Sequence, residues 1–368
     1  MASQVPNAGG QPLASAESRH NEWLSPGGAA YDFRSDVRTS PTPAMLEAIT
    51  YASLLDGIQD SDPSTKKLEE HVAAMAGHEA GLWVVSGTMG NLVSLRTLLT
   101  QPPYSIICDE RAHFLNNETG GVFAFSGAVP QPVRPSNGKY LTLEDILPHV
   151  KLGHGEKVHA VPTRVIALEN TLRGMVMPLA ETRRICEFAH ANEIKVHLDG
   201  ARLWEAVTAT GSSLADYASL FDTVTMCFSK GLGAPAGAIV LGNKATIRHA
   251  RWVRQSIGGG IRQPGLLTEA AFVAVRDTFE GKKLAKTHEV ASRIGRHWEA
   301  CGANLLYPTE TNMVWLDFTG QQFGLADVIA KGKEKGITLN RDRLVIHYQI
   351  SEAAVQILMD VMTELTRS

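Results

Sequence analysis

Short apolar runs alternate with helical patterns along most of the chain. The runs are three to five residues long and lie at 82–85, 105–108, 165–168, 196–198, 224–228 and 238–241. Runs of this length with helices between them are typical of a largely parallel sheet that helices cover on both faces. Because ligands of such sheets bind beyond the carboxyl ends of the strands, the residues that follow each run are the first candidates for chemistry.

Residues 62–77 carry the first well-marked helical pattern. Ser64 is expected to cap this helix, apolar residues at 68, 72 and 75 recur at helical spacing, and Gly77 is expected to end it. Residues 1–30 have no such periodicity, because Gly, Ala, Ser, Pro and Asn are frequent there. We interpret them as a flexible N-terminal arm, or as an element that needs a partner surface.

The end of the chain repeats the alternation on a smaller scale. The pattern predicts a strand at 312–318, a helix at 325–335, a strand at 343–349 and a helix at 351–365, which suffices for a small α/β lobe. The charged stretch 280–296 is expected to be a connecting helix with a solvated face. We therefore predict an arm at 1–30, a large domain at 31–280 and a small C-terminal domain at 281–368.

Composition excludes several classes of function. The 368 residues carry 35 Lys and Arg against 38 Asp and Glu, so the net charge of −3 favours neither nucleic acid nor an anionic membrane as a partner. No apolar run approaches the roughly 18–20 residues that span a bilayer, and no signal-peptide pattern opens the chain, so we expect a cytoplasmic protein. The four cysteines show no C-x-x-C spacing, which argues against a zinc ribbon or a disulfide framework.

A glycine-rich turn follows the first apolar run. The segment Ser86-Gly87-Thr88-Met89-Gly90-Asn91 opens a helical pattern, so backbone N–H groups and a Thr hydroxyl converge at the positive end of a helix. This arrangement suits a phosphate group, although glycine-rich turns between strand and helix are also common structural features. The turn is neither G-x-G-x-x-G nor a Walker loop, which disfavours a dinucleotide fold or a P-loop ATPase.

A carboxylate and a lysine follow two later runs. Asp199 comes directly after the run at 196–198, where it could be a metal ligand, a catalytic acid or part of a structural ion pair. Lys230 follows the run at 224–228 and precedes Gly231, an unusual place for a lysine that only decorates the surface. A lysine at such a strand end suits Schiff-base chemistry.

Together these three features form a more specific pattern. A phosphate cradle, then an Asp at a strand end, then a Ser-Lys pair about 30 residues later is the order in which an enzyme holds pyridoxal phosphate. The lysine binds the cofactor aldehyde, and the aspartate keeps the pyridine nitrogen protonated, so the ring becomes an electron sink. No metal is assigned.

Nine short motifs then occur in a recognisable order along residues 31–368. They are Arg34-Ser35-Asp36, Ser86-Gly87-Thr88-Met89-Gly90-Asn91, Ala112-His113, Glu118-Thr119-Gly120-Gly121, Leu168-Glu169-Asn170-Thr171, His197-Leu198-Asp199-Gly200-Ala201-Arg202, Ser229-Lys230-Gly231, Gly258-Gly259-Gly260-Ile261-Arg262-Gln263 and Thr311-Asn312-Met313. In this order they resemble the threonine aldolase family of pyridoxal phosphate enzymes. The resemblance implies an α/β aspartate-aminotransferase-like fold, with a mostly parallel seven-stranded sheet in the large domain and a small C-terminal α/β domain.

The resemblance also implies which residues hold the cofactor, pyridoxal 5'-phosphate. Lys230 corresponds to the Schiff-base lysine and Asp199 to the partner of the pyridine nitrogen. Gly87, Thr88 and Ser229 correspond to the phosphate ligands. The site is thus expected to draw on three strand ends.

The resemblance also implies which residues contact the substrate. His113 corresponds to a histidine that stacks on the cofactor ring and is our candidate base, and Arg202 to an arginine near the phenolic oxygen and the substrate carboxylate. Arg343, assisted by Ser35, corresponds to a second carboxylate clamp. Because planar guanidinium groups bind carboxylates bidentately, the two arginines fit a small amino acid.

The resemblance implies a homodimer or a dimer of dimers with shared active sites. Gly258-Gly259-Gly260 and Arg262 are expected to reach the cofactor of the neighbouring subunit. Two histidines are expected to be structural: His347, and His197, which we expect to point to the face of its strand opposite to Asp199.

The implied reaction is the cleavage of L-threonine or L-allo-threonine to glycine and acetaldehyde. Leu172 stands where many members of the family carry His or Asn, at a place where an imidazole can meet the β-hydroxyl group of the substrate. A pocket without that partner could instead exchange the proton at Cα. Alanine racemisation, known among fungal relatives of this family, is therefore the alternative, and it would supply D-alanine to fungal peptide biosynthesis.

Overall fold

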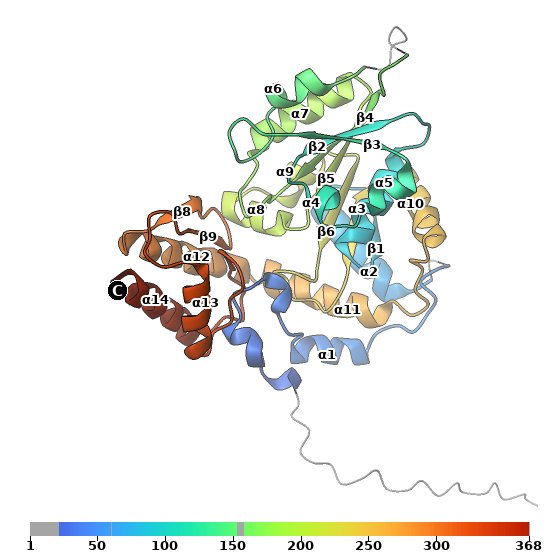
Figure 1. Ribbon diagram of the computed structural model, residues 1–368. Coiled ribbons are helices and arrows are strands. Elements are labelled where there is room, and N and C mark those ends of the chain that lie inside the picture. The colour runs from blue at the N-terminus through green and yellow to red at the C-terminus, as the bar shows by residue number, and fades with distance from the viewer. Residues whose placement is uncertain (1–21, 60, 153–157, 368) are drawn as a thin grey trace, which may run out of the picture.

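A seven-stranded sheet forms the centre of the larger lobe (Figure 1). The computed structural model describes residues 22–59, 61–152 and 158–367. The sheet has the order β1-β7-β6-β5-β4-β2-β3, and β7 runs in the direction opposite to the other six strands. Its strands are β1 (Ala80–Val84), β2 (Ser105–Asp109), β3 (Val129–Val133), β4 (Thr163–Glu169), β5 (Lys195–Asp199), β6 (Thr223–Cys227) and β7 (Ala238–Gly242). The predicted α/β class with a mostly parallel seven-stranded sheet is confirmed.

The sequence pattern found six of these strands and missed β3. Two prolines interrupt β3, whose sequence is Val-Pro-Gln-Pro-Val. Proline has no backbone N–H and cannot donate to a ladder. β3 lies at the edge of the sheet, where it pairs with β2 alone, so only one side of the strand needs ladder bonds. An edge strand tolerates prolines that would exclude a segment from the centre of the sheet.

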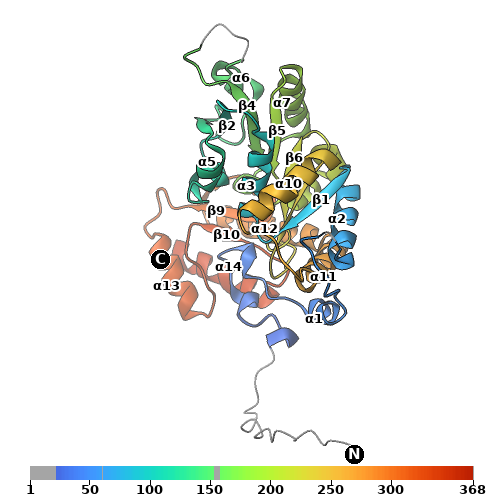
Figure 2. The same ribbon diagram turned by 90° about the vertical axis from the view of Figure 1, so that its right-hand side faces the viewer.

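Helices cover both faces of the sheet (Figures 1 and 2). One face packs against α2 (Pro63–Met75), α7 (Leu179–Ala191), α8 (Leu203–Thr210), α9 (Leu214–Ala218) and α11 (Gly265–Ala274). The other face packs against α3 (Gly87–Leu98), α5 (Gly121–Ser126) and α10 (Lys244–Ser256). Each face of the sheet has its own hydrophobic core, and alternate strand residues pack into one or the other. In β1, Trp83 packs on one face and Leu82 on the other, because successive side chains of a strand point to opposite faces.

The predicted cap of α2 is wrong by two residues. The helix begins at Pro63, and Asp62 is its N-cap: the Asp62 carboxylate accepts a hydrogen bond from the Thr65 backbone N–H at 2.9 Å. Proline favours the first helical position, so the capping residue is the one before it. The Ser64 hydroxyl instead accepts a bond from the backbone N–H of Ser53.

A smaller lobe is built around a three-stranded sheet of order β10-β9-β8. Its elements are α12 (Lys283–Ala300), β8 (Asn304–Tyr307), β9 (Met313–Asp317), α13 (Leu325–Glu334), β10 (Arg343–Val345) and α14 (Glu352–Arg367). The predicted order of strands and helices is present, with β8 added and β10 shorter than expected. The Ile346 N–H still donates to the Asn312 carbonyl oxygen, which extends the pairing with β9 by one residue before a turn at 348–349.

The segment before α1 (Pro43–Thr50) packs on this smaller lobe (Figure 1). Phe33 is fully buried in the core of the lobe, its N–H donates to the Thr338 carbonyl oxygen, and its own carbonyl oxygen accepts from Val345 N–H. Both ends of the described chain therefore build the small lobe. We propose a domain division near residue 281 on this basis, with the segment around Phe33 counted in the small lobe.

The remaining elements are short, and they connect the two lobes or the strands. They are η1 (Glu22–Leu24), η2 (Gly27–Tyr31), η3 (Asp36–Arg38), α1 (Pro43–Thr50), α4 (His113–Asn116), α6 (Leu143–Ile146), η4 (Leu147–His149) and η5 (Val275–Glu280). Of the predicted N-terminal arm, residues 1–21 lie outside the described residues. Among the described helices, none combines the length and the apolar character that a membrane crossing requires.

Candidate active site

The carboxyl ends of β5 and β6 and the beginning of α3 surround a cavity of about 190 Å³. Residues from separate parts of the sequence line it: Ser86, Gly87, Thr88, Asn91, His113, Glu118, Asp199, Ala201, Cys227, Ser229 and Lys230. The structure thus brings together the predicted glycine-rich turn, histidine, aspartate and lysine. The cavity lies where parallel sheets bind their ligands.

The first turn of α3 forms one wall of the cavity. The Ser86 hydroxyl caps the helix by accepting from the Met89 N–H at 3.2 Å. The N–H groups of Gly87 and Thr88 lie in the first turn, where a helix supplies no acceptor for them. Gly90 allows the close approach of α3 to the sheet, because a Cβ atom there would lie 2.4 Å from Cγ2 of Thr225 on β6. The turn therefore offers unpaired donors to an anion.

Asp199 is buried at the end of β5. Its Oδ2 accepts a hydrogen bond from the Asn91 side-chain amide at 2.8 Å, and its Oδ1 accepts from the Ala201 N–H at 3.1 Å. Glu169 on the neighbouring strand β4 is its register partner. Burial, and then the Asp199 carboxylate, raise the pKa of Glu169 well above its ordinary value.

Lys230 presents an amine to the cavity from the segment after β6. Among the residues that the structure describes, no carboxylate forms an ion pair with it. Cys227 lies nearby on β6; burial raises the pKa of its thiol, and the Lys230 ammonium partly opposes this. The lysine thus has no anionic partner within the described chain, as expected of an amine that a ligand engages.

His113 begins α4 and is linked to a buried carboxylate. Its Nδ1 lies 2.7 Å from Oε1 of Glu118, whose side chain is buried. The His113 backbone N–H donates to Oε2 of Glu169 at 2.8 Å. The sequence places Glu118 in a motif but indicates no role for its side chain. The five-residue separation from His113 was the only available signal.

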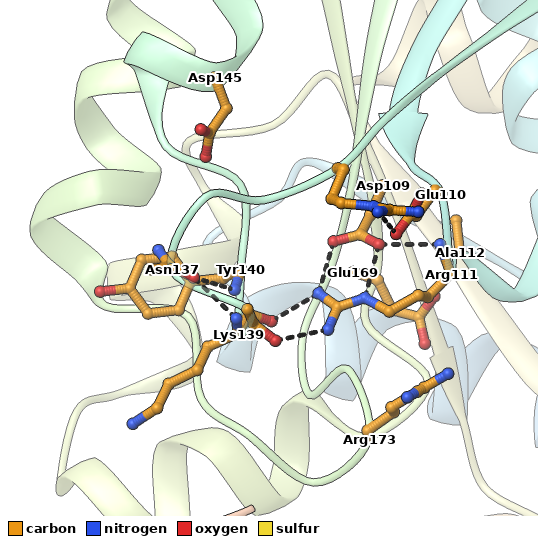
Figure 3. A network of polar contacts seen from close by, with 12 residues as sticks. Asp109, Glu110, Arg111, Ala112, Asn137, Lys139, Tyr140, Asp145, Glu169 and Arg173 are labelled. Atoms are coloured by element: carbon orange, nitrogen blue, oxygen red, sulfur yellow. Dashed lines mark hydrogen bonds and ion pairs between the residues drawn. The ribbon is translucent and has the colours of Figure 1, made fainter.

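A polar network fixes the loop that carries His113 (Figure 3). Arg111 forms a two-point ion pair with Asp109 at the end of β2, with both nitrogen–oxygen distances 2.8 Å. The same guanidinium donates to the carbonyl oxygens of Gly138 and Lys139. These bonds join the segment between β2 and α4 to the loop at 138–139, so they restrain the backbone just before His113.

Arg202 is held by a buried aspartate that the sequence did not single out. Nε and Nη2 of Arg202 donate to the two carboxylate oxygens of Asp36 at 2.8 and 2.6 Å, and Asp36 is fully buried. Burial alone would raise the pKa of Asp36, but Arg202 outweighs it and the pKa lies well below the ordinary value. Ser35 precedes this aspartate as the N-cap of η3. The pair occupies one edge of the guanidinium, which leaves Nη1 for a ligand.

Arg343, at the start of β10, has no such partner. Its Nε is buried without a hydrogen bond, and no described carboxylate forms an ion pair with it. Its guanidinium lies 5.9 Å from the centre of the Trp315 ring. Burial, and then the like charge of Arg202, lower the pKa of Arg343. Its Nη2 donates to the Arg34 carbonyl oxygen at 3.5 Å. A guanidinium without a carboxylate partner, beside a second guanidinium, is well suited to bind a carboxylate.

Five predicted site residues are not among those that line the cavity: Ser35, Arg202, Arg343, Arg262 and Leu172. Arg262 is exposed and pairs with Asp56 at 2.6 Å. Leu172 is buried in a turn in which it bridges to Met175. The expectation that Arg262 serves a neighbouring subunit stays a prediction.

The prediction for His197 is wrong in one respect. His197 is fully buried, but it lies on the same face of β5 as Asp199, because residues two apart along a strand share a face. Its Nε2 lies 3.2 Å from Oδ1 of Asn91, the residue whose amide binds Asp199. His197 therefore belongs to the polar surroundings of the cavity. His347 is buried and contacts the Asp32 carbonyl oxygen.

The sequence matches known proteins over most of its length. The family described as "Beta-eliminating lyase" matches residues 32–321. "Aldolase vrtJ" of Penicillium aethiopicum is 48% identical over 344 residues, which cover 94% of this chain and 88% of the relative. "Alanine racemase TOXG" of Cochliobolus carbonum is 42% identical, covering 94% and 90%. "Low-specificity L-threonine aldolase" of Eremothecium gossypii is 42% identical, covering 91% and 87%.

Solved structures share the fold. The threonine aldolase of Leishmania major superposes with a TM-score of 0.78 at 21% sequence identity, covering 91% of this chain and 99% of that one. At this level of identity the likeness shows the fold, and it confirms the predicted fold type.

Proposed function

The chain belongs to the beta-eliminating lyase family, and from this premise we propose that it cleaves L-threonine and L-allo-threonine to glycine and acetaldehyde with pyridoxal phosphate as cofactor. The observation that carries the proposal is the single cavity that Lys230, Asp199 and His113 share with the first turn of α3. Threonine aldolases among the relatives support the choice of substrate.

The residues of the cavity fit this cofactor. Lys230 supplies an amine without an anionic partner, and Asp199 supplies a buried carboxylate for the pyridine nitrogen. Unpaired donors of Gly87 and Thr88, together with the Ser229 hydroxyl, suit the phosphate. When bound, the cofactor supplies an electron-withdrawing ring that stabilises negative charge at Cα of the amino acid.

The two arginines divide the remaining binding roles. Arg343 has no carboxylate partner among the described residues, so we assign it the substrate carboxylate. Its Nη2 donates to the carbonyl oxygen of Arg34, the residue before Ser35, which brings Ser35 into the same region. Arg202 keeps Nη1 for the phenolic oxygen of the cofactor or the substrate carboxylate, while Asp36 fixes the orientation of its side chain.

His113 is the proposed base. Because its Nδ1 faces the Glu118 carboxylate, the ring carries its proton there and leaves Nε2 as an acceptor. Nε2 accepts the proton of the β-hydroxyl group, the Cα–Cβ bond breaks, and acetaldehyde leaves. A proton returned to Cα then gives glycine, which balances the reaction.

Alanine racemisation is the second candidate. Leu172 offers no imidazole to a β-hydroxyl group, and "Alanine racemase TOXG" matches nearly the whole chain. Lys230 and His113 both line the cavity, so two groups are present that could exchange a proton at Cα.

One experiment separates the two activities. The purified protein with added pyridoxal phosphate is incubated with L-threonine, L-allo-threonine or L-alanine, and acetaldehyde, glycine and D-alanine are measured. We expect acetaldehyde and glycine in equal amounts. D-alanine without acetaldehyde would overturn the proposal in favour of racemisation.

Arg343→Lys is expected to raise KM for L-threonine by about 10- to 100-fold, with a smaller change in kcat. A lysine keeps the charge but loses the planar pair of donors that binds a carboxylate. Arg341→Lys, two residues away and exposed, serves as the matched control. Steady-state kinetics measure both, and an unchanged KM in Arg343→Lys would assign the carboxylate to another residue.

We further propose a homo-oligomer with shared active sites. Tyr51, Leu54 and Leu55 are exposed apolar side chains in the loop that also carries Asp56, the partner of Arg262. Exposed apolar side chains gathered in one loop are typical of an interface. A second subunit placed there would come next to Arg262.

A further inference from the structure

The side-chain amide of Asn91 lies at the centre of a buried polar chain. Its Nδ2 donates to Oδ2 of Asp199 at 2.8 Å and to Oε1 of Glu118 at 3.0 Å. Its Oδ1 lies 3.2 Å from Nε2 of His197. Asn91 is 1% exposed, so these protein groups, rather than solvent, satisfy the amide.

The contacts fix the orientation of the amide. The amide oxygen only accepts, so Nε2 of His197 must carry a hydrogen. Burial lowers the pKa of His197 to about 4, so its ring is neutral and Nδ1 is an acceptor. The Thr223 hydroxyl, 2.9 Å from Nδ1, is then the donor. With its oxygen held in this way, Asn91 directs both of its N–H bonds toward carboxylates.

Each of these carboxylates serves a different part of the site. Asp199 is the partner proposed for the pyridine nitrogen, and Glu118 holds Nδ1 of His113 at 2.7 Å. His113, Glu118 and Asp199 lie close enough to share a metal ion, with ligand atoms within 4.8 Å of one another. The Asn91 amide binds both carboxylates, so hydrogen bonds already account for their proximity.

We propose that Asn91 is a positioning residue that holds Asp199 for the cofactor and, through Glu118, His113 for the substrate. This rests on the proposed function, since it assumes that pyridoxal phosphate occupies the cavity. The Asn91 amide then orients both the carboxylate proposed for the pyridine nitrogen, Asp199, and the proposed base, His113. A change at Asn91 should therefore alter both cofactor binding and the step that depends on His113.

The first test uses Asn91→Leu, which keeps the size of the side chain and removes both donors. Titration with pyridoxal phosphate, followed by protein fluorescence, is expected to show an affinity about 10- to 100-fold lower than in the wild type, as loss of a hydrogen bond to a charged acceptor predicts. The absorbance band of the bound cofactor is expected to shift, because the pyridine nitrogen loses its oriented partner. Ser94→Ala is the matched control, since Ser94 is one turn further along α3, buried, and bonded to Thr225 instead.

The second test asks whether Asn91 acts through His113. The turnover of Asn91→Leu, His113→Asn and the double variant is compared at saturating cofactor. We expect Asn91→Leu to lower kcat by a larger factor in the wild-type background than in the His113→Asn background, where only the loss through Asp199 remains, while the loss of cofactor affinity persists in both. Asn91→Ser, with circular dichroism as a check of folding, replaces Asn91→Leu should the latter fail to fold.

The outcomes distinguish a failure of the proposed function from a failure of the role assigned to Asn91. A wild-type protein that binds no pyridoxal phosphate overturns the proposed function and this inference with it. If the wild type binds and turns over but Asn91→Leu keeps its cofactor affinity and absorbance, the role toward Asp199 is wrong. Equal losses of kcat in both backgrounds would show that Asn91 does not act through His113.

Discussion

Lys230→Ala is expected to abolish turnover and covalent attachment of pyridoxal phosphate. Lys230 supplies the only amine among the described residues that line the cavity. Without it, the cofactor aldehyde has no partner in the protein, and binding rests on the phosphate and ring contacts alone. The variant should also fold normally, because Lys230 forms no ion pair with any described carboxylate.

The measurement is borohydride reduction followed by peptide mass spectrometry. In the wild type, the peptide that contains Lys230 should gain the mass of the reduced cofactor, and the visible absorbance band should disappear. Lys195→Ala is the control: Lys195 lies at the other end of β5, exposed and paired with Asp222. A wild type without a modified peptide, or a Lys230→Ala variant with full activity, would contradict the assignment.

The strands and the central residues of the site were predictable because local features encode them. Six strands are short apolar runs, and the glycine-rich turn, Asp199 and the Ser229-Lys230 pair follow three of those runs. Edge strand β3 was missed because its prolines are tolerated only where one side of the strand is free, which no local pattern reveals.

The supporting partners could not be predicted, because they join distant parts of the chain. Asp36 and Arg202 are 166 residues apart, and Asn91 and Asp199 are 108 residues apart. Each pairing depends on how α3, η3 and β5 pack, so motif order alone cannot show it. The wrong face assigned to His197 was avoidable, since strand alternation places it with Asp199.

His113→Asn is expected to lower kcat for L-threonine cleavage by about 10²- to 10⁴-fold, the contribution typical of a positioned acid or base. The cofactor should still bind, because Lys230 and Asp199 remain. Glu118→Gln should give a smaller loss, since it weakens the hold on Nδ1 but leaves the Nε2 acceptor in place. His190→Asn, on the surface of α7, is the control for substitution of an exposed histidine.

Assays of His113→Asn with L-threonine and L-allo-threonine test whether His113 takes the β-hydroxyl proton. If His113 takes the β-hydroxyl proton, His113→Asn loses acetaldehyde formation from both L-threonine and L-allo-threonine, because both substrates must lose that proton before Cα–Cβ cleavage. KM should change less than kcat, since the substrate carboxylate is assigned to Arg343. Should His113→Asn retain wild-type kcat with bound cofactor, the base lies elsewhere, and the close Glu118 contact would then serve only to fix the loop before α5.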